Sequence, residues 1–153
     1  LGDDRWGILY ESMDDRHNEG YYDDRESSSQ YSWAIWKRDR LVALEAPEEG
    51  RVTLANTRTE LESGPSLQDK ILLNYETTRN GWIRIELTQP KLWPPAPMEP
   101  IEGYSFDECE PLRGDSLSGE VRWNGSSDIS SLKGREVAVR IRMCQAKLFS
   151  ISM

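Results

Sequence analysis

The sequence is poor in the side chains that most often carry catalysis or bind transition metals. Among 153 residues there is one histidine, His17, and there are two cysteines, Cys109 and Cys144. A zinc site requires three or four ligands, and these residues lie far apart in the chain. The G-x-S-x-G, H-E-x-x-H and phosphate-loop patterns do not occur. We therefore interpret His17 as a surface histidine.

Long hydrophobic runs and positive charge are also scarce. The longest apolar runs, such as Ile71-Leu72-Leu73, are only a few residues, so we expect neither membrane insertion nor a signal peptide within these 153 residues. The 27 acidic residues outnumber the 19 lysines and arginines, which gives a net charge of −8. A surface of this sign repels phosphate groups, so nucleic acid is not an expected partner.

What the sequence does contain is a pattern of short strands. Residues alternate between apolar and polar over three segments, which is typical of strands with one face on a core. Turn-forming residues recur between the segments and predict an all-β fold, an antiparallel two-sheet β-sandwich. The alternating segments are 71–76, 82–87 and 137–143, and further strands are expected at 31–37, 40–46, 51–56, 118–123 and 147–153.

The alternation also assigns faces to individual residues. Ile85, Val139 and Ile141 are expected in the core, and Trp123 is expected to share the inward face of its strand with Val121. The outward residues Arg140 and Arg142 are expected to pair with acids across the sheet, each pair stabilising the fold by a few tenths of a kcal/mol.

Two local signals predict connections. Asn80-Gly81 separates two predicted strands, and this dipeptide favours a two-residue hairpin turn. The best helical candidate is a single turn at 127–132.

The second half of the chain carries motifs with closely spaced turn residues. Residues 103–116 read G-Y-S-F-D-E-C-E-P-L-R-G-D-S, and residues 121–134 read V-R-W-N-G-S-S-D-I-S-S-L-K-G. These motifs resemble the C-terminal β-sandwich domain of bacterial proteins related to glycoside hydrolase family 32, in which a five-bladed propeller precedes the sandwich. The run 32–46, S-W-A-I-W-K-R-D-R-L-V-A-L-E-A, is similar to the segment that leaves the propeller. The resemblance implies a jelly-roll or concanavalin-like sandwich over residues 38–153 and a propeller-blade-like segment over residues 1–37.

The resemblance also implies a function. The family's catalytic carboxylates belong to the propeller, and its W-M-N-D-P-N-G segment has no counterpart in this sequence. The chain is therefore expected to be a non-catalytic, extracellular accessory module of a glycosidase-like protein that binds carbohydrate. The alternative is a structural, self-assembly or protein-interaction role, including a homo-oligomer, because a blade-like segment needs neighbours to cover its faces.

Sugar binding by stacking requires exposed aromatic rings beside polar side chains. Trp82 lies on the outward face of its strand near Arg84, and Trp93 lies in the Pro-rich segment 91–100. These three residues are the candidates for carbohydrate binding. The alternative is that both rings cover apolar surface on neighbouring segments.

Four carboxylates crowd one short segment, and they could hold an ion. Oxygen ligands from a loop suit calcium, which would be the one cofactor. In the alternative, the carboxylates face water, and the last of them caps a turn. The four residues are Asp107, Glu108, Glu110 and Asp115.

Two covalent features remain open. Cys109 and Cys144 are compatible with one disulfide or with two free thiols. Asn124-Gly125-Ser126 fits the N-glycosylation pattern, and the turn-forming property of Asn-Gly explains the same triplet.

Overall fold

The computed structural model describes residues 2–13, 29–58, 69–89, 98–133 and 135–153. Their fold is all-β with two antiparallel sheets, which confirms the predicted class and is compatible with a β-sandwich. The chain divides into two compact units, Leu1–Leu41 and Val42–Met153, whereas the boundary predicted from the sequence falls after residue 37. No helix in the described ranges is long and apolar enough to cross a membrane.

The first unit contains a two-stranded hairpin of β1 (Arg5–Met13) and β2 (Ser29–Lys37). The strands pair in register from Arg5 opposite Lys37 to Met13 opposite Ser29. Large apolar side chains on both faces of this hairpin are exposed. They are Trp6, Ile8 and Tyr10 on one face and Leu9, Tyr31, Trp33 and Ile35 on the other.

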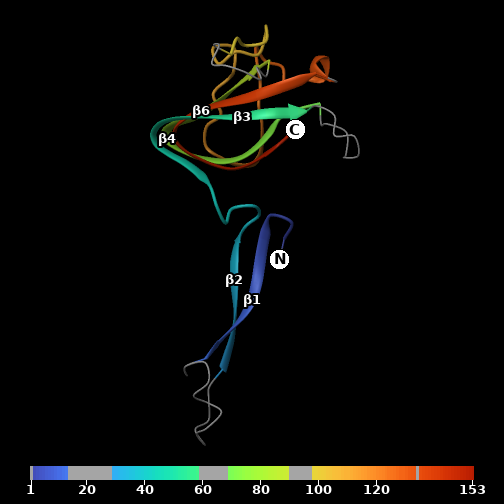
Figure 1. Ribbon diagram of the computed structural model, residues 1–153. Coiled ribbons are helices and arrows are strands. Elements are labelled where there is room, and N and C mark those ends of the chain that lie inside the picture. The colour runs from blue at the N-terminus through green and yellow to red at the C-terminus, as the bar shows by residue number, and fades with distance from the viewer. Residues whose placement is uncertain (1, 14–28, 59–68, 90–97, 134) are drawn as a thin grey trace, which may run out of the picture. The chain divides into compact units, whose positions relative to one another are not determined.

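The second unit is built on a four-stranded sheet with the order β3-β6-β4-β5. Figure 1 labels three of these strands, β3, β4 and β6. The four strands are β3 (Leu44–Arg58), β4 (Leu72–Thr88), β5 (Asp115–Glu120) and β6 (Glu136–Ser152). The central pair of long strands, β4 and β6, carries the alternating residues read from the sequence. Ile85, Val139 and Ile141 are at most 1% exposed, so their predicted core positions are confirmed.

The three longest strands of this sheet bend at the same level. Register shifts occur between Ala46 and Glu49 in β3 and between Thr77 and Trp82 in β4. Opposite both shifts lies Gln145 of β6, which has a positive φ of 46°. Bulges that are aligned in this way bend a sheet as a whole, and Figure 1 shows the curved course of the strands.

The aligned bulges explain why several predicted strand breaks are wrong. Segments 71–76 and 82–87 form one strand, β4, and segments 137–143 and 147–153 form another, β6. Likewise, β3 contains the predicted strand 51–56 and part of the predicted strand 40–46. Asn80-Gly81 lies inside β4, and neither residue has the positive φ that the predicted hairpin turn requires.

A layer of irregular chain covers the inner face of the sheet. Backbone hydrogen bonds fasten it to β4, where Ile83 and Leu112 exchange N–H···O bonds of 3.0 and 2.9 Å. Trp123 and Val121 are buried on the inward side as predicted, and a 3₁₀ turn at Ser130–Leu132 matches the helical candidate. The core therefore lies between β3, β6 and β4 on one side and residues 101–112 and 121–132 on the other.

Candidate functional site

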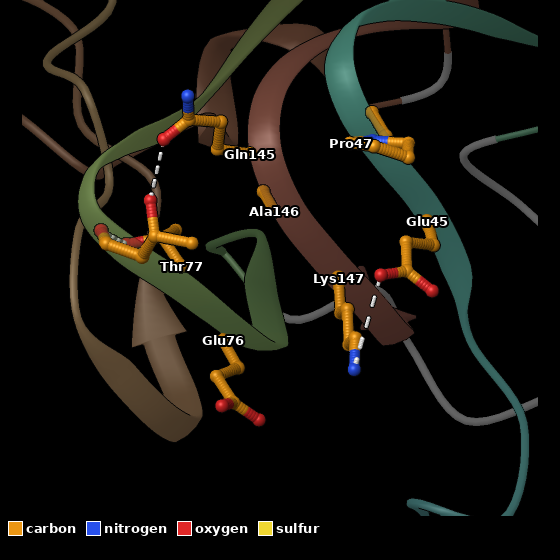
Figure 2. A pocket seen from close by; sticks show the side chains of 9 residues that line it. Glu45, Pro47, Glu76, Thr77, Gln145, Ala146 and Lys147 are labelled. Carbon is orange, nitrogen blue, oxygen red and sulfur yellow. Dashed lines mark hydrogen bonds and ion pairs between the residues drawn. The ribbon is translucent and has the colours of Figure 1, made fainter.

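The bend in the sheet creates a pocket of about 320 Å³. Figure 2 shows its lining, which comes from the three strands that meet at the bend: Glu45, Ala46 and Pro47 of β3, Glu76, Thr77 and Thr78 of β4, and Gln145, Ala146 and Lys147 of β6. The Thr78 hydroxyl donates to Gln145 Oε1 at 2.7 Å, which ties β4 to β6 at the bend. The two alanines are buried, so the polar groups surround a small apolar floor.

The chemistry of this pocket is modest. Lys147 lies between Glu45 and Glu76 in the strand register, and its Nζ is 3.9 Å from Glu45 Oε1 (Figure 2). Both side chains of this ion pair are about half exposed, so the pair is screened by water. The volume is at the small end for a ligand pocket.

A second cluster lies just beyond the bend, on the face of the sheet turned away from the core. Trp82 is half-buried there, with the guanidinium carbons of Arg84 and Arg142 at 6.0 and 5.5 Å from the centre of its ring. Both distances are within the range of a cation–π contact. The prediction that Trp82 and Arg84 share this outward face is therefore confirmed.

Three arginines of this cluster lie directly opposite one another on three adjacent strands. In the strand register, Arg142 of β6 lies opposite Arg51 of β3 on one side and opposite Arg84 of β4 on the other. We call these three residues the arginine row. Like charges directly opposite one another destabilise a sheet unless an anion compensates them.

One carboxylate compensates part of the arginine row. Glu49 accepts a hydrogen bond from Arg142 Nε at 2.7 Å and lies 3.5 Å from Arg51 Nη2. The bond from Arg142 holds the pKa of Glu49 below its usual value, so the carboxylate stays ionised. Arg84 instead donates to the Phe106 carbonyl at 3.0 Å, and no acid of the described chain pairs with it.

The next cross-strand pair along the sheet, Glu86 of β4 opposite Arg140 of β6, is more buried than the sequence suggested. Arg140 Nη1 donates to Glu86 Oε1 at 2.6 Å, and the Glu86 side chain is only 8% exposed. The Phe106 N–H donates to the other Glu86 oxygen at 3.3 Å, and the Phe106 ring faces Arg140 at 5.5 Å. Cross-strand pairing of Arg140 and Arg142 is confirmed. The expected stabilisation of a few tenths of a kcal/mol is too small for Arg140, because removing its side chain would leave the buried Glu86 carboxylate without an ion-pair partner.

The carboxylates considered for calcium are not brought together. The described residues contain no group of three or more histidine, cysteine or acidic side chains that could hold a metal ion. Glu108 Oε2 instead accepts bonds from the Ser105 N–H (3.0 Å) and hydroxyl (2.7 Å), which lower its pKa. Asp107 and Glu110 are exposed, and Asp115 begins β5. Calcium binding thus has no geometric support here and stays an untested prediction.

The Asn124 triplet forms a tight turn. Asn124 and Gly125 have φ values of 50° and 85°, and Trp123 and Ser126 exchange backbone hydrogen bonds of 2.8 and 2.9 Å across them. This is the geometry of a type I′ hairpin turn. Asn124 is exposed, and whether it is glycosylated remains a separate prediction.

Both cysteines are free thiols, which is one of the two alternatives left by the sequence. Cys109 is buried in the core, where its sulfur accepts the Ile85 N–H at 3.3 Å. Burial raises its pKa to about 11, so the thiol is protonated at neutral pH and is a poor nucleophile. Cys144 lies next to the bend, opposite Trp82.

The structure adds residues that the sequence did not single out. Arg51, Glu49 and Arg142 join Trp82 and Arg84 only through the pairing of β3, β6 and β4, which a single sequence does not reveal. Trp93 and His17 lie outside the described residues. No protein-family model, curated protein or solved structure matches the chain.

Proposed function

We propose that this chain is a non-catalytic, extracellular β-sandwich module that binds carbohydrate, as an accessory part of a glycosidase-like protein. The observation that carries the proposal is the half-buried ring of Trp82 on the outward face of the sheet, with the guanidinium carbons of Arg84 and Arg142 over it at 6.0 and 5.5 Å from its centre. An aromatic ring provides an apolar platform for a sugar face, and guanidinium groups donate hydrogen bonds to its oxygens.

The same face argues for binding in preference to hydrolysis. A glycosidase needs one carboxylic acid that can donate a proton and a second carboxylate across the sugar. Glu49 and Glu86 are each bonded to an arginine, at 2.7 and 2.6 Å. The bond from Arg142 lowers the pKa of Glu49, which opposes the protonated form that an acid catalyst requires.

Replacing Trp82 tests the proposal. We expect Trp82→Ala to weaken glycan binding by about tenfold, because a central aromatic anchor carries a large share of a binding energy. Isothermal titration with a panel of plant and microbial oligosaccharides measures the change. Trp33→Ala is the matched control, since Trp33 is an exposed tryptophan of the other unit. If no oligosaccharide binds the unaltered protein at millimolar concentration, the proposal fails.

The hairpin favours a second candidate, a structural or protein-interaction role. A two-stranded hairpin is marginally stable alone, and this one exposes large apolar side chains on both faces. The indole nitrogen of Trp36 is also buried without a hydrogen-bond partner in the described structure. Multi-angle light scattering separates the two roles, because a chain that stays monomeric at high concentration contradicts self-assembly.

A further inference from the structure

The charge of the outer face differs from that of the whole protein. The chain as a whole carries a net charge of −8. The arginine row holds three cations across β3, β6 and β4, and Glu49 is the one carboxylate in ion-pair contact with it among the described residues. Asp107, from the loop beside β4, adds a weaker attraction to Arg142. Positive charge therefore exceeds negative charge on this part of the surface.

The guanidinium groups are oriented so that their N–H edges can bind an anion. A guanidinium that faces an aromatic ring keeps its N–H groups in the plane of the fork, where they are free to meet a carboxylate or sulfate side-on. Arg84 has this position over Trp82, and within the described residues it donates one hydrogen bond, to the Phe106 carbonyl. An incoming anion would give Arg84 the acidic partner that the described chain does not provide.

From these contacts we propose that the carbohydrate bound at Trp82 is an acidic saccharide, whose carboxylate or sulfate groups lie on the arginine row. This inference rests on the proposed carbohydrate-binding function and narrows it to a ligand class. Adjacent strands are about 4.8 Å apart, so the row from Arg84 to Arg51 spans roughly 10 Å. That span suits a short oligosaccharide with acidic groups on successive sugars.

Charge density distinguishes this ligand from other polyanions. The net charge of −8 opposes the approach of a densely charged chain such as nucleic acid, and dissolved salt screens that repulsion beyond about 8–10 Å. A uronate chain carries one charge per sugar ring, which is fewer per length than a nucleic-acid duplex with one charge per about 1.7 Å, and its ring face can lie on Trp82. Both properties favour a saccharide over a nucleic-acid duplex at this site.

The test compares matched ligands on matched variants by isothermal titration. The ligands are tetragalacturonate, its fully methyl-esterified neutral form, a sulfated tetrasaccharide, and triglutamate as an acid without a sugar ring. We expect the charged tetrasaccharides to bind at least tenfold more tightly than the ester, and Arg84→Gln to remove that advantage. The stronger of the two charged sugars identifies carboxylate or sulfate as the recognised group.

Two further variants complete the design. Arg51→Gln should reduce binding of the acidic tetrasaccharide in the same direction as Arg84→Gln. Arg122→Gln is the control, because Arg122 pairs with Glu120 at 2.8 Å outside the arginine row, and it should leave affinity unchanged. Thermal melts establish that each variant is folded.

The outcomes separate this inference from the proposed function. If the neutral ester binds as tightly as the acid and Trp82→Ala weakens both, the acidic class is wrong and carbohydrate binding stands. If none of the sugars binds, both are wrong. If triglutamate or a short oligonucleotide binds as tightly as tetragalacturonate, the site recognises anions in general and the saccharide class is overturned.

Discussion

Replacing Trp123 by alanine is expected to destabilise the protein by about 3–5 kcal/mol, which is a large part of the stability of a typical domain. Trp123 is 3% exposed, and its indole N–H donates to the Ile85 carbonyl at 3.0 Å. Its ring also meets Tyr104 edge-on, with centroids 5.3 Å apart. Truncation removes all of these contacts and leaves a cavity between the sheet and its covering layer. Urea unfolding followed by far-ultraviolet circular dichroism measures the loss.

Two variants show which part of Trp123 matters. Trp123→Phe keeps most of the buried ring but leaves the Ile85 carbonyl without its donor, so we expect a smaller loss of about 1–3 kcal/mol. Trp33→Ala, on the exposed hairpin, should change stability by less than about 0.5 kcal/mol. A Trp123→Ala protein as stable as Trp33→Ala would contradict the packing described for the core.

The sequence predicts side-chain faces better than it predicts strand ends. The period-two pattern identifies Ile83, Ile85 and Leu87 as inward and Trp82 and Arg84 as outward, because the pleat itself imposes that alternation. The pattern does not reveal that Glu86, formally outward, is buried. Its burial depends on Arg140 and Phe106, which come from distant parts of the chain.

The two Asn-Gly dipeptides show how context decides a local signal. At Asn124-Gly125 both residues adopt positive φ, and the predicted turn forms. Asn80-Gly81 has the same composition but lies in a strand that crosses the bend of β6, so tertiary pairing overrides the turn preference. A single sequence does not distinguish the two cases, because the difference lies in which strand is opposite.

The candidate site was predictable only in part for the same reason. Trp82 and Arg84 lie on one strand, so alternation places them together. The arginine row joins residues from three strands, and it exists only in the observed register, since a one-residue slip would turn Arg142 to the other face. The pocket at the bend likewise depends on the register shifts of β3 and β4, which coincide opposite Gln145 of β6.

The bend itself gives the second large prediction, which concerns Gly81. A Cβ atom on this residue would lie 2.3 Å from the Gln145 carbonyl oxygen and 2.9 Å from that of Cys144. Both are backbone atoms, so β4 and β6 must separate to accept a side chain. We expect Gly81→Ala to cost about 3 kcal/mol and to lower the melting temperature by roughly 10 °C.

A second glycine, Gly103, serves as a control that distinguishes destabilisation by steric clash from destabilisation by backbone strain. Gly103 has a φ of 86°, and a Cβ atom on it would meet no other atom within 4 Å, so Gly103→Ala tests strain alone and should cost about 1–2 kcal/mol. Gly81 has no positive φ, so its larger expected loss comes from the close approach of the two strands. If Gly81→Ala proves as stable as the unaltered protein, β4 and β6 do not approach at Gln145. The bend, the pocket and the position of Trp82 beside them would then need a different register.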